Sequence, residues 1–103
     1  MTLNSDFPKP IILIIEALNS KIRRQILIEL EKKQSLSHLE ILNIGTTLNS
    51  NINNHIKKLI SAGLIKGFIK ETEYLSLHYE LTSLGRDSIN GLFSAFKPKE
   101  DPS

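Results

Sequence analysis

The chain contains no cysteine and no tryptophan, and its aromatic residues are two tyrosines and four phenylalanines. Without thiols, disulfide bonds, thiolate metal sites and thiol-based redox sensing are excluded. The formal net charge is only +2, far from the basic excess of a histone-like protein. The apolar run at residues 11–15 is too short to span a bilayer, and no secretion signal precedes it. We therefore expect a cytoplasmic protein without a membrane partner.

What the chain does have is the length and hydrophobic content of one folded domain, with 103 residues of which 40% are hydrophobic. Its patterns predict helices at 10–18, 21–33, about 37–42 and about 50–62, strands at 64–70 and 74–81, and a helix from 83 to about 96. The predicted fold class is therefore mostly α with a small β-hairpin (α+β). A single domain is expected over residues 10–96, with flexible ends at 1–9 and 97–103.

Several residues mark where these elements begin and end. Asn49 is the expected N-cap of the helix at 50–62, and Ser37 with Glu40 has the spacing of a capping box. Gly63 is the expected C-terminal glycine of the helix that Asn49 starts. The connection between these two helices is predicted over residues 43–47.

Helical spacing also predicts which side chains face the core. Arg23 and Arg24 are expected to face water. The residues expected to face inward are Ile22, Ile26, Leu27, Leu30, Leu36, Leu39, Leu42, Ile52, Ile56, Leu59 and Ile60.

The other face of the helix at 50–62 has an unusual composition for a surface that serves only solubility. It carries amides, hydroxyls and lysines: Ser50, Asn51, Asn53, Asn54, Lys57, Lys58 and Ser61. Glu and Lys usually dominate a solvated helix face because they favour helix more than Asn does. Asn can pair with an adenine edge, and Lys can meet phosphate or guanine. The face therefore predicts a helix that contacts DNA, with an ordinary solvated surface as the alternative.

The first and last helices carry more apolar surface than a small monomer can cover. The segment 11–18 is apolar on nearly every side, and the last helix has a wide apolar face. A second copy of the chain could cover both. The predicted dimer interface consists of Ile11, Ile12, Ile14, Ile15, Ile89, Leu92, Phe93 and Phe96.

Three segments in order resemble a known family. Residues 20–27 (SKIRRQIL) are similar to its opening core helix, and residues 53–65 (NNHIKKLISAGLI) to its recognition helix and exit. Residues 79–85 (YELTSLG) resemble the end of its wing. Over residues 19–85 the chain thus resembles winged helix-turn-helix regulators of the ArsR and MarR type. The resemblance implies a homodimer that places two recognition helices in successive major grooves, with half-sites ~34 Å apart.

The chain departs from that pattern at three places. Asn53 stands where the family often has Ser, and the wing loop carries Glu71 and Glu73 instead of basic residues. The wing tip is therefore expected to stay out of the minor groove. The helix at 37–42 lacks the Cys-x-Cys motif of metal-sensing members, so thiolate metal sensing is not carried over.

The resulting function is sequence-specific binding of double-stranded DNA by a homodimeric transcriptional regulator. The alternative is a winged-helix module that binds protein and not DNA. Expected base contacts come from Ser50, Asn51, Asn53 and Asn54, and expected phosphate contacts from Thr46, Thr47, Lys57, Lys58, Lys66 and, more weakly, Lys70. The sequence does not identify a small-molecule effector.

The sequence gives little support for a catalytic site or a metal site. The three histidines, His38, His55 and His78, lie on different elements and lack the spacing of metal ligands. The chain has no glycine-rich phosphate loop and no nucleophile-elbow serine. We therefore expect no enzyme activity, no metal and no cofactor.

Overall fold

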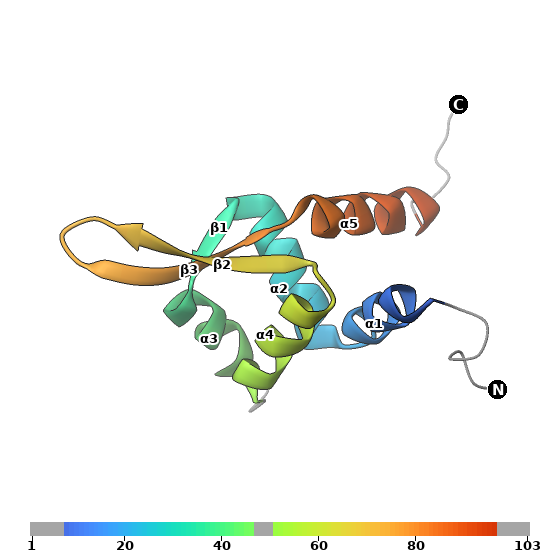
Figure 1. Cartoon of the computed structure of the whole chain (residues 1–103), viewed down its shortest axis with the longest axis horizontal. Coiled ribbons are helices and arrows are strands. Elements are labelled where there is room, and N and C mark those ends of the chain that lie inside the picture. The colour runs from blue at the N-terminus through green and yellow to red at the C-terminus, as the bar shows by residue number, and fades with distance from the viewer. Residues whose placement is uncertain (1–7, 47–50, 97–103) are drawn as a thin grey trace.

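The computed structural model describes residues 8–46 and 51–96, with the side chains of 45–46 and 92–96 left out. Its elements run along the chain (Figure 1) as α1 (Lys9–Leu18), α2 (Lys21–Lys33), β1 (Ser35–Ser37), α3 (His38–Thr46), α4 (Ile52–Ser61), β2 (Ile65–Glu71), β3 (Leu75–Leu81) and α5 (Ser83–Phe96). The predicted α+β class is confirmed. The expected flexible segments at 1–9 and 97–103 fall outside the description except for Pro8 and Lys9, and Lys9 already belongs to α1.

The sheet has three antiparallel strands in the order β1–β3–β2. The predicted hairpin is β2–β3, in which Gly67 pairs with Tyr79 and Ile69 with Leu77. Strand β1 was not predicted, because three residues are too few for an alternating pattern to appear. It adds Leu36 to the sheet opposite Tyr79.

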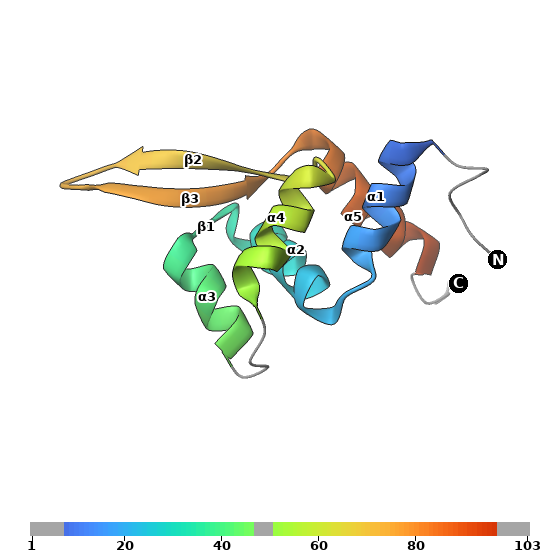
Figure 2. The same ribbon diagram turned by 60° about the horizontal axis from the view of Figure 1, so that its bottom comes forward.

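The hydrophobic core fills the space between the helices and the base of the hairpin. Apolar residues from α2, α4 and the start of β2 supply most of it, and the fully covered side chains are Ile26, Leu27, Leu30, Ile41, Leu59, Leu64 and Ile65. The hairpin continues beyond this core as a wing, while α1 and α5 lie at the opposite end of the molecule (Figures 1 and 2). No helix in the described part of the chain combines the length and hydropathy of a bilayer span.

Polar caps fix the ends of the helices. The predicted capping box is confirmed, since the Glu40 carboxylate accepts from the Ser37 N–H at 2.8 Å and the Ser37 hydroxyl accepts from the Glu40 N–H at 3.1 Å. The capping hydrogen bond lowers the pKa of Glu40. Because Ser37 precedes the first helical residue, α3 begins at His38 and continues to Thr46, through most of the connection predicted at 43–47.

The prediction that Leu39 faces the core is wrong, because its side chain is 66% exposed while Ile41 is fully buried. Residues two positions apart in an α-helix point about 200° away from each other, so the face that contains Ile41 excludes Leu39. Ile60 was also expected in the core and is exposed, since it lies one step around the helix from buried Leu59.

Gly63 ends α4 as predicted. Its φ of 78° lies in the left-handed region that glycine tolerates. The Gly63 N–H donates to Ile60 O at 2.9 Å, and the Leu64 N–H donates to Leu59 O at 3.0 Å. These two bonds form a Schellman motif, which satisfies carbonyl groups at the end of the helix.

One junction joins the end of α4 to the start of α5. The Thr82 N–H donates to Leu64 O at 3.0 Å, and the Thr82 hydroxyl donates to Gly63 O while accepting from the Gly85 N–H. A methyl group added at Gly85 would lie 2.0 Å from Leu64 O. The close approach of these backbones therefore requires glycine at position 85.

Candidate nucleic-acid interface

Helix α4 presents one buried face and one exposed polar face. Ile52, Ile56 and Leu59 are buried and hold it against the core. The predicted site residues on the opposite face are all exposed: Asn51, Asn53, Asn54, Lys57 and Lys58. The described residues of this face include no carboxylate, so it offers hydrogen-bonding amides and positive charge together.

The N-cap of α4 is Asn51, whereas the sequence predicted Asn49. The Asn51 side-chain oxygen accepts from the Asn54 N–H at 3.3 Å. The cap occupies that oxygen and leaves the NH₂ group of the same amide free to donate. Asn49 has a suitable side chain as well, and capping chemistry alone does not choose between two asparagines only two residues apart.

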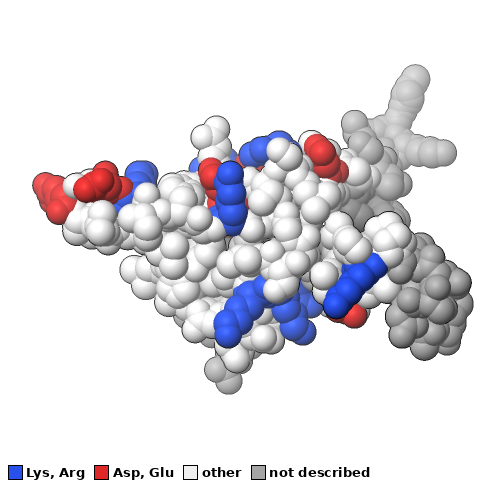
Figure 3. Space-filling model, viewed as in Figure 1, with Lys and Arg blue, Asp and Glu red and all other residues white. Residues whose placement is uncertain are grey.

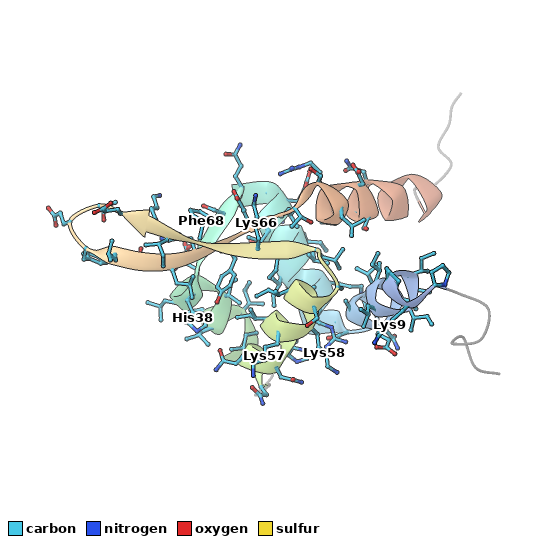
Figure 4. The ribbon with its side chains drawn as sticks, viewed as in Figure 1. Lys9, His38, Lys57, Lys58, Lys66 and Phe68 are labelled. Carbon is cyan, nitrogen blue, oxygen red and sulfur yellow. The ribbon has the colours of Figure 1, made fainter. Side chains whose placement is uncertain are left out.

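The lysines differ in whether they have a charged partner. Within the described residues, Lys57 and Lys58 form no ion pair, whereas the Lys66 ammonium lies 3.5 Å from a Glu80 carboxylate oxygen. Figure 4 shows Lys57 and Lys58 on the same side of the molecule, over α4, and Figure 3 shows basic side chains gathered on that side. Their positive charge is therefore available to an anionic partner, and that of Lys66 is partly compensated.

Lys9 was not predicted as a site residue. It is the first residue of α1, is exposed, and lies on the side of the molecule that also carries Lys57 and Lys58 (Figure 4). Helices α1 and α4 pack against each other, which brings the two basic segments together. Lys9 was missed because the sequence predicted a helix that begins at Pro10. Proline is favoured in the first turn of a helix, so a start at Lys9 was also compatible with the sequence.

The prediction that Arg23 faces water is wrong, because the residue is only 6% exposed. Its Nε donates to Ala17 O at 2.7 Å and its Nη2 to Glu16 O at 2.8 Å. The remaining arm lies 2.9 Å from Nδ1 of His55. These partners replace water around the guanidinium, and burial lowers the pKa of Arg23. A helical pattern marks position 23 only as lying beside the buried face, and does not reveal these acceptors.

His55 is the only residue of α4 described as a partner of Arg23. Burial lowers the pKa of His55, and the positive charges of Arg23 and Lys58 lower it further. Because a guanidinium can only donate, Nδ1 must be the acceptor and the ring proton must sit on Nε2. His55 is thus neutral and bound inward, at the edge of the exposed face of α4.

The wing offers different chemistry. Lys70, Glu71 and Glu73 are exposed near its tip, as are the apolar side chains of Ile69 and Leu77. Lys66 and Lys70 alternate with Gly67 and Ile69 along β2 and therefore lie on the sheet face that points away from the core. The predicted phosphate contacts on the wing are separated from those on α4.

The other predicted site residues differ in whether the structure describes them and in how exposed they are. Thr47 and Ser50 lie outside the described residues, as does the side chain of Thr46. Of the predicted dimer residues, Ile11 and Ile15 are exposed and Ile12 and Ile14 are half-buried, while the side chains of Leu92, Phe93 and Phe96 are outside the description. Ile89 is 3% exposed and belongs to the core of a single chain, so its burial does not require a second copy.

Comparisons with known proteins give structural matches only. No protein-family model matches the chain, and no curated protein matches it. A protein assigned to the MarR family of transcriptional regulators from Enterococcus faecalis V583 is similar with a TM-score of 0.67 at 16% identity, over 91% of this chain and 86% of that chain.

Two further solved structures have the same architecture. An ArsR family transcriptional regulator is similar with a TM-score of 0.61 at 16% identity, over 87% of this chain and 89% of that one. HlyU from Vibrio cholerae N16961 also has a TM-score of 0.61, at 22% identity, over 95% of this chain and 100% of that one. The chain therefore has the winged helix-turn-helix fold found among MarR and ArsR type regulators.

Proposed function

We propose that the protein is a transcriptional regulator that binds double-stranded DNA through α4. The observation that carries this proposal is the exposed face of α4, which carries three asparagines and no carboxylate, together with two lysines that form no ion pair among the described residues. The likeness to solved transcriptional regulators supports the same conclusion and gives no indication of an enzyme.

The arrangement of polar groups along α4 fits the major groove. Recognition helices contact base edges mainly through residues near their N-terminus. Asn51, Asn53 and Asn54 occupy that end. Asn53 and Asn54 can each pair with N6 and N7 of adenine, whereas Asn51, whose oxygen caps the helix, can donate through its NH₂ group. Lys57 and Lys58 follow one turn later, where they can contact phosphate. We therefore propose an operator that contains A·T pairs, with Lys9 as an additional phosphate contact.

The partner copy would pack against α1 and α5. Both helices lie at the end of the molecule opposite the wing (Figures 1 and 2), and Ile11 and Ile15 of α1 are exposed. The apolar sequence of α5 at Leu92, Phe93 and Phe96 supports the same interface. Two-fold symmetry then requires half-sites about one helical turn apart, ~34 Å.

Selection of bound sequences from a random DNA pool tests DNA recognition directly. Recovery of a two-fold symmetric motif is expected. Asn53→Ala and Asn54→Ala should each reduce discrimination at one base position by about 1–3 kcal/mol. Gln25→Ala is the matched control, since it removes an exposed amide from α2 instead. If no sequence is enriched, or if all three variants discriminate as the parent does, α4 does not read bases.

The dimer is tested by light scattering after gel filtration. Ile15→Glu places a charge on the exposed side of α1 and should convert the dimer to a monomer. Leu75→Glu is the control, because it places the same charge on an exposed apolar position of the wing. A parent protein that is monomeric at micromolar concentration contradicts the two-half-site model.

One observation favours a second candidate function, a module that binds protein. The wing combines exposed Ile69, Tyr74, Leu75 and Leu77 with the acidic residues Glu71 and Glu73, which suits a protein surface better than phosphate. Salt titration distinguishes the two functions. Affinity for DNA falls steeply with salt because counterions are released, whereas an apolar contact responds weakly.

A further inference from the structure

The buried side chain of Arg23 joins three helices at one point. It belongs to α2, binds the carbonyl groups of Glu16 and Ala17 at the end of α1, and contacts His55 on α4. The neighbouring Arg24 donates to Leu18 O at 2.8 Å. Three successive carbonyls at the end of α1 are thereby bound by arginines of α2, and Glu16 O also accepts from the Asn19 N–H at 3.2 Å.

The guanidinium is well suited to this position because its planar donors have fixed directions. Nε and Nη2 are held by α1, so the direction of Nη1 toward α4 is fixed as well. A lysine could supply the same charge but could not reach all three acceptors from a rigid plane. The position of His55 is therefore linked to the end of α1 through a single side chain.

The contact requires an uncharged imidazole. A proton on Nδ1 would turn a hydrogen bond into two opposed donors and place a second positive charge 2.9 Å from the first. The charges acting on His55 are Arg23 from α2 and Lys58 from α4, and Glu16 of α1 acts on Arg23. In the described part of the chain, α3 and β2 contribute no charge that acts on the ring.

We propose that Arg23 and His55 are positioning residues that hold α4 against α1, so that protonation of His55 releases the helix and weakens DNA binding. The link to DNA rests on the proposed function. In a dimer formed through α1, this contact would fix the position of α4 relative to the two-fold axis. It would therefore influence the distance between the two copies of α4. A role of His55 as a direct phosphate contact predicts the opposite response, because an imidazolium would bind DNA more tightly.

Nuclear magnetic resonance of the imidazole rings in the free protein tests the contact without DNA. His55 should carry its proton on Nε2 at neutral pH and titrate below its ordinary value of 6.5. Acidification should then shift the amide signals of α4 and of the last turn of α1 together. A ring that carries its proton on Nδ1, or that titrates at or above 6.5, overturns the contact.

The link to DNA is tested with a fluorescein-labelled A·T-rich duplex of about 30 base pairs, which can hold two half-sites. Affinity of the parent protein should be constant near neutral pH and, below the pKa of His55 in the free protein, should fall by up to about tenfold for each further pH unit. His38→Gln should retain this response, because His38 contacts Tyr79 at 3.1 Å and not α1. Tighter binding on acidification overturns the proposal.

Conservative variants separate positioning from simple stability. His55→Asn places a permanent neutral acceptor near Nδ1, so its affinity at neutral pH should stay within about twofold of the parent, and its pH response should disappear. His55→Leu and Arg23→Lys should bind weakly at every pH. An acid response that persists in His55→Asn overturns the proposal. If the parent protein binds no duplex at any pH, the proposed function and the link to DNA both fail, while the ring titration still decides the contact.

Discussion

The two candidate contact regions of the molecule, α4 and the wing, differ in their chemistry and in how the rest of the fold holds them in place. Helix α4 exposes asparagines and lysines, and its other face lies in the core. The wing exposes apolar side chains and ends near Glu71 and Glu73, with only its base on the core. The comparison teaches that the fold alone does not determine which of the two regions binds a partner. The exposed residues and charges of each region determine it.

The difference in support has a structural origin. The start of α4 is capped by Asn51, its centre is bound by Arg23 through His55, and its end is closed at Gly63. The distal wing is stabilised mainly by hydrogen bonds between β2 and β3. A two-stranded ribbon without a core is marginal by itself, so we expect α4 to be the more rigid part.

The largest expected effect separates the two parts by their contribution to stability. Leu59→Ala on α4 should lower the free energy of unfolding by about 2–5 kcal/mol, since it removes a fully buried side chain. Leu75→Ala on the wing is 65% exposed and should change it by less than about 0.5 kcal/mol. Urea denaturation measures both values. Similar losses in the two variants would mean that the wing is packed as well as α4.

The next effect concerns the junction that both parts share, where Leu64 ends the turn after α4 and precedes β2. Gly85→Ala should cost about 1–3 kcal/mol or more, because its methyl group would overlap Leu64 O. Gly91→Ala is the control on the same helix, as it has open space around it. It should be neutral or stabilise the protein by up to about 1 kcal/mol. Thermal unfolding of both variants tests the difference, and equal melting temperatures would contradict it.

The third effect compares the two parts as DNA contacts. Lys57→Ala should reduce the slope of log affinity against log salt by about 1, the value for one lost phosphate contact. Lys70→Ala should leave the slope unchanged, because Lys70 lies beside the acidic wing tip. Fluorescence anisotropy over a range of salt concentrations measures both. If Lys70→Ala has the larger effect, the wing is the main contact and the assignment is reversed.

The smallest effect concerns α3, which packs against both α4 and β3. The pKa of Glu40 is lowered in the folded protein by its hydrogen bond to Ser37 N–H. The stabilising contribution is therefore complete above the unfolded value of 4.5 and is lost as pH falls through the lower folded value. Because Glu40 is exposed, the loss should be small. Glu40→Gln should show a weaker acid dependence of its melting temperature than the parent, and identical profiles would contradict the assignment.

Much of the fold could be predicted where a local pattern is strong. Helix α2 has the predicted bounds, because a cap at Ser20, an amphipathic stripe and two terminal lysines mark it together. Strand β1 was missed since its three residues acquire meaning only when paired with β3. Local signals also did not distinguish Asn51 from Asn49 as the cap of α4.

The site was predictable only for the face of α4. The exposed asparagines and lysines follow from helical spacing, whereas the contact between Arg23 and His55 joins residues 32 positions apart. Lys9 requires knowledge that α1 packs beside α4. Contacts of this kind depend on tertiary structure, and a single sequence carries no direct record of them.

The position of β2 in the sheet has a consequence for solubility. It is an edge strand, and no other strand of the described chain pairs with its outer side. Open edges invite pairing between molecules, and natural proteins often protect them with lysine. Lys66 and Lys70 lie on this strand, but Lys66 is paired with Glu80 and Lys70 adjoins Glu71, so lysine charge protects the edge from self-association only in part.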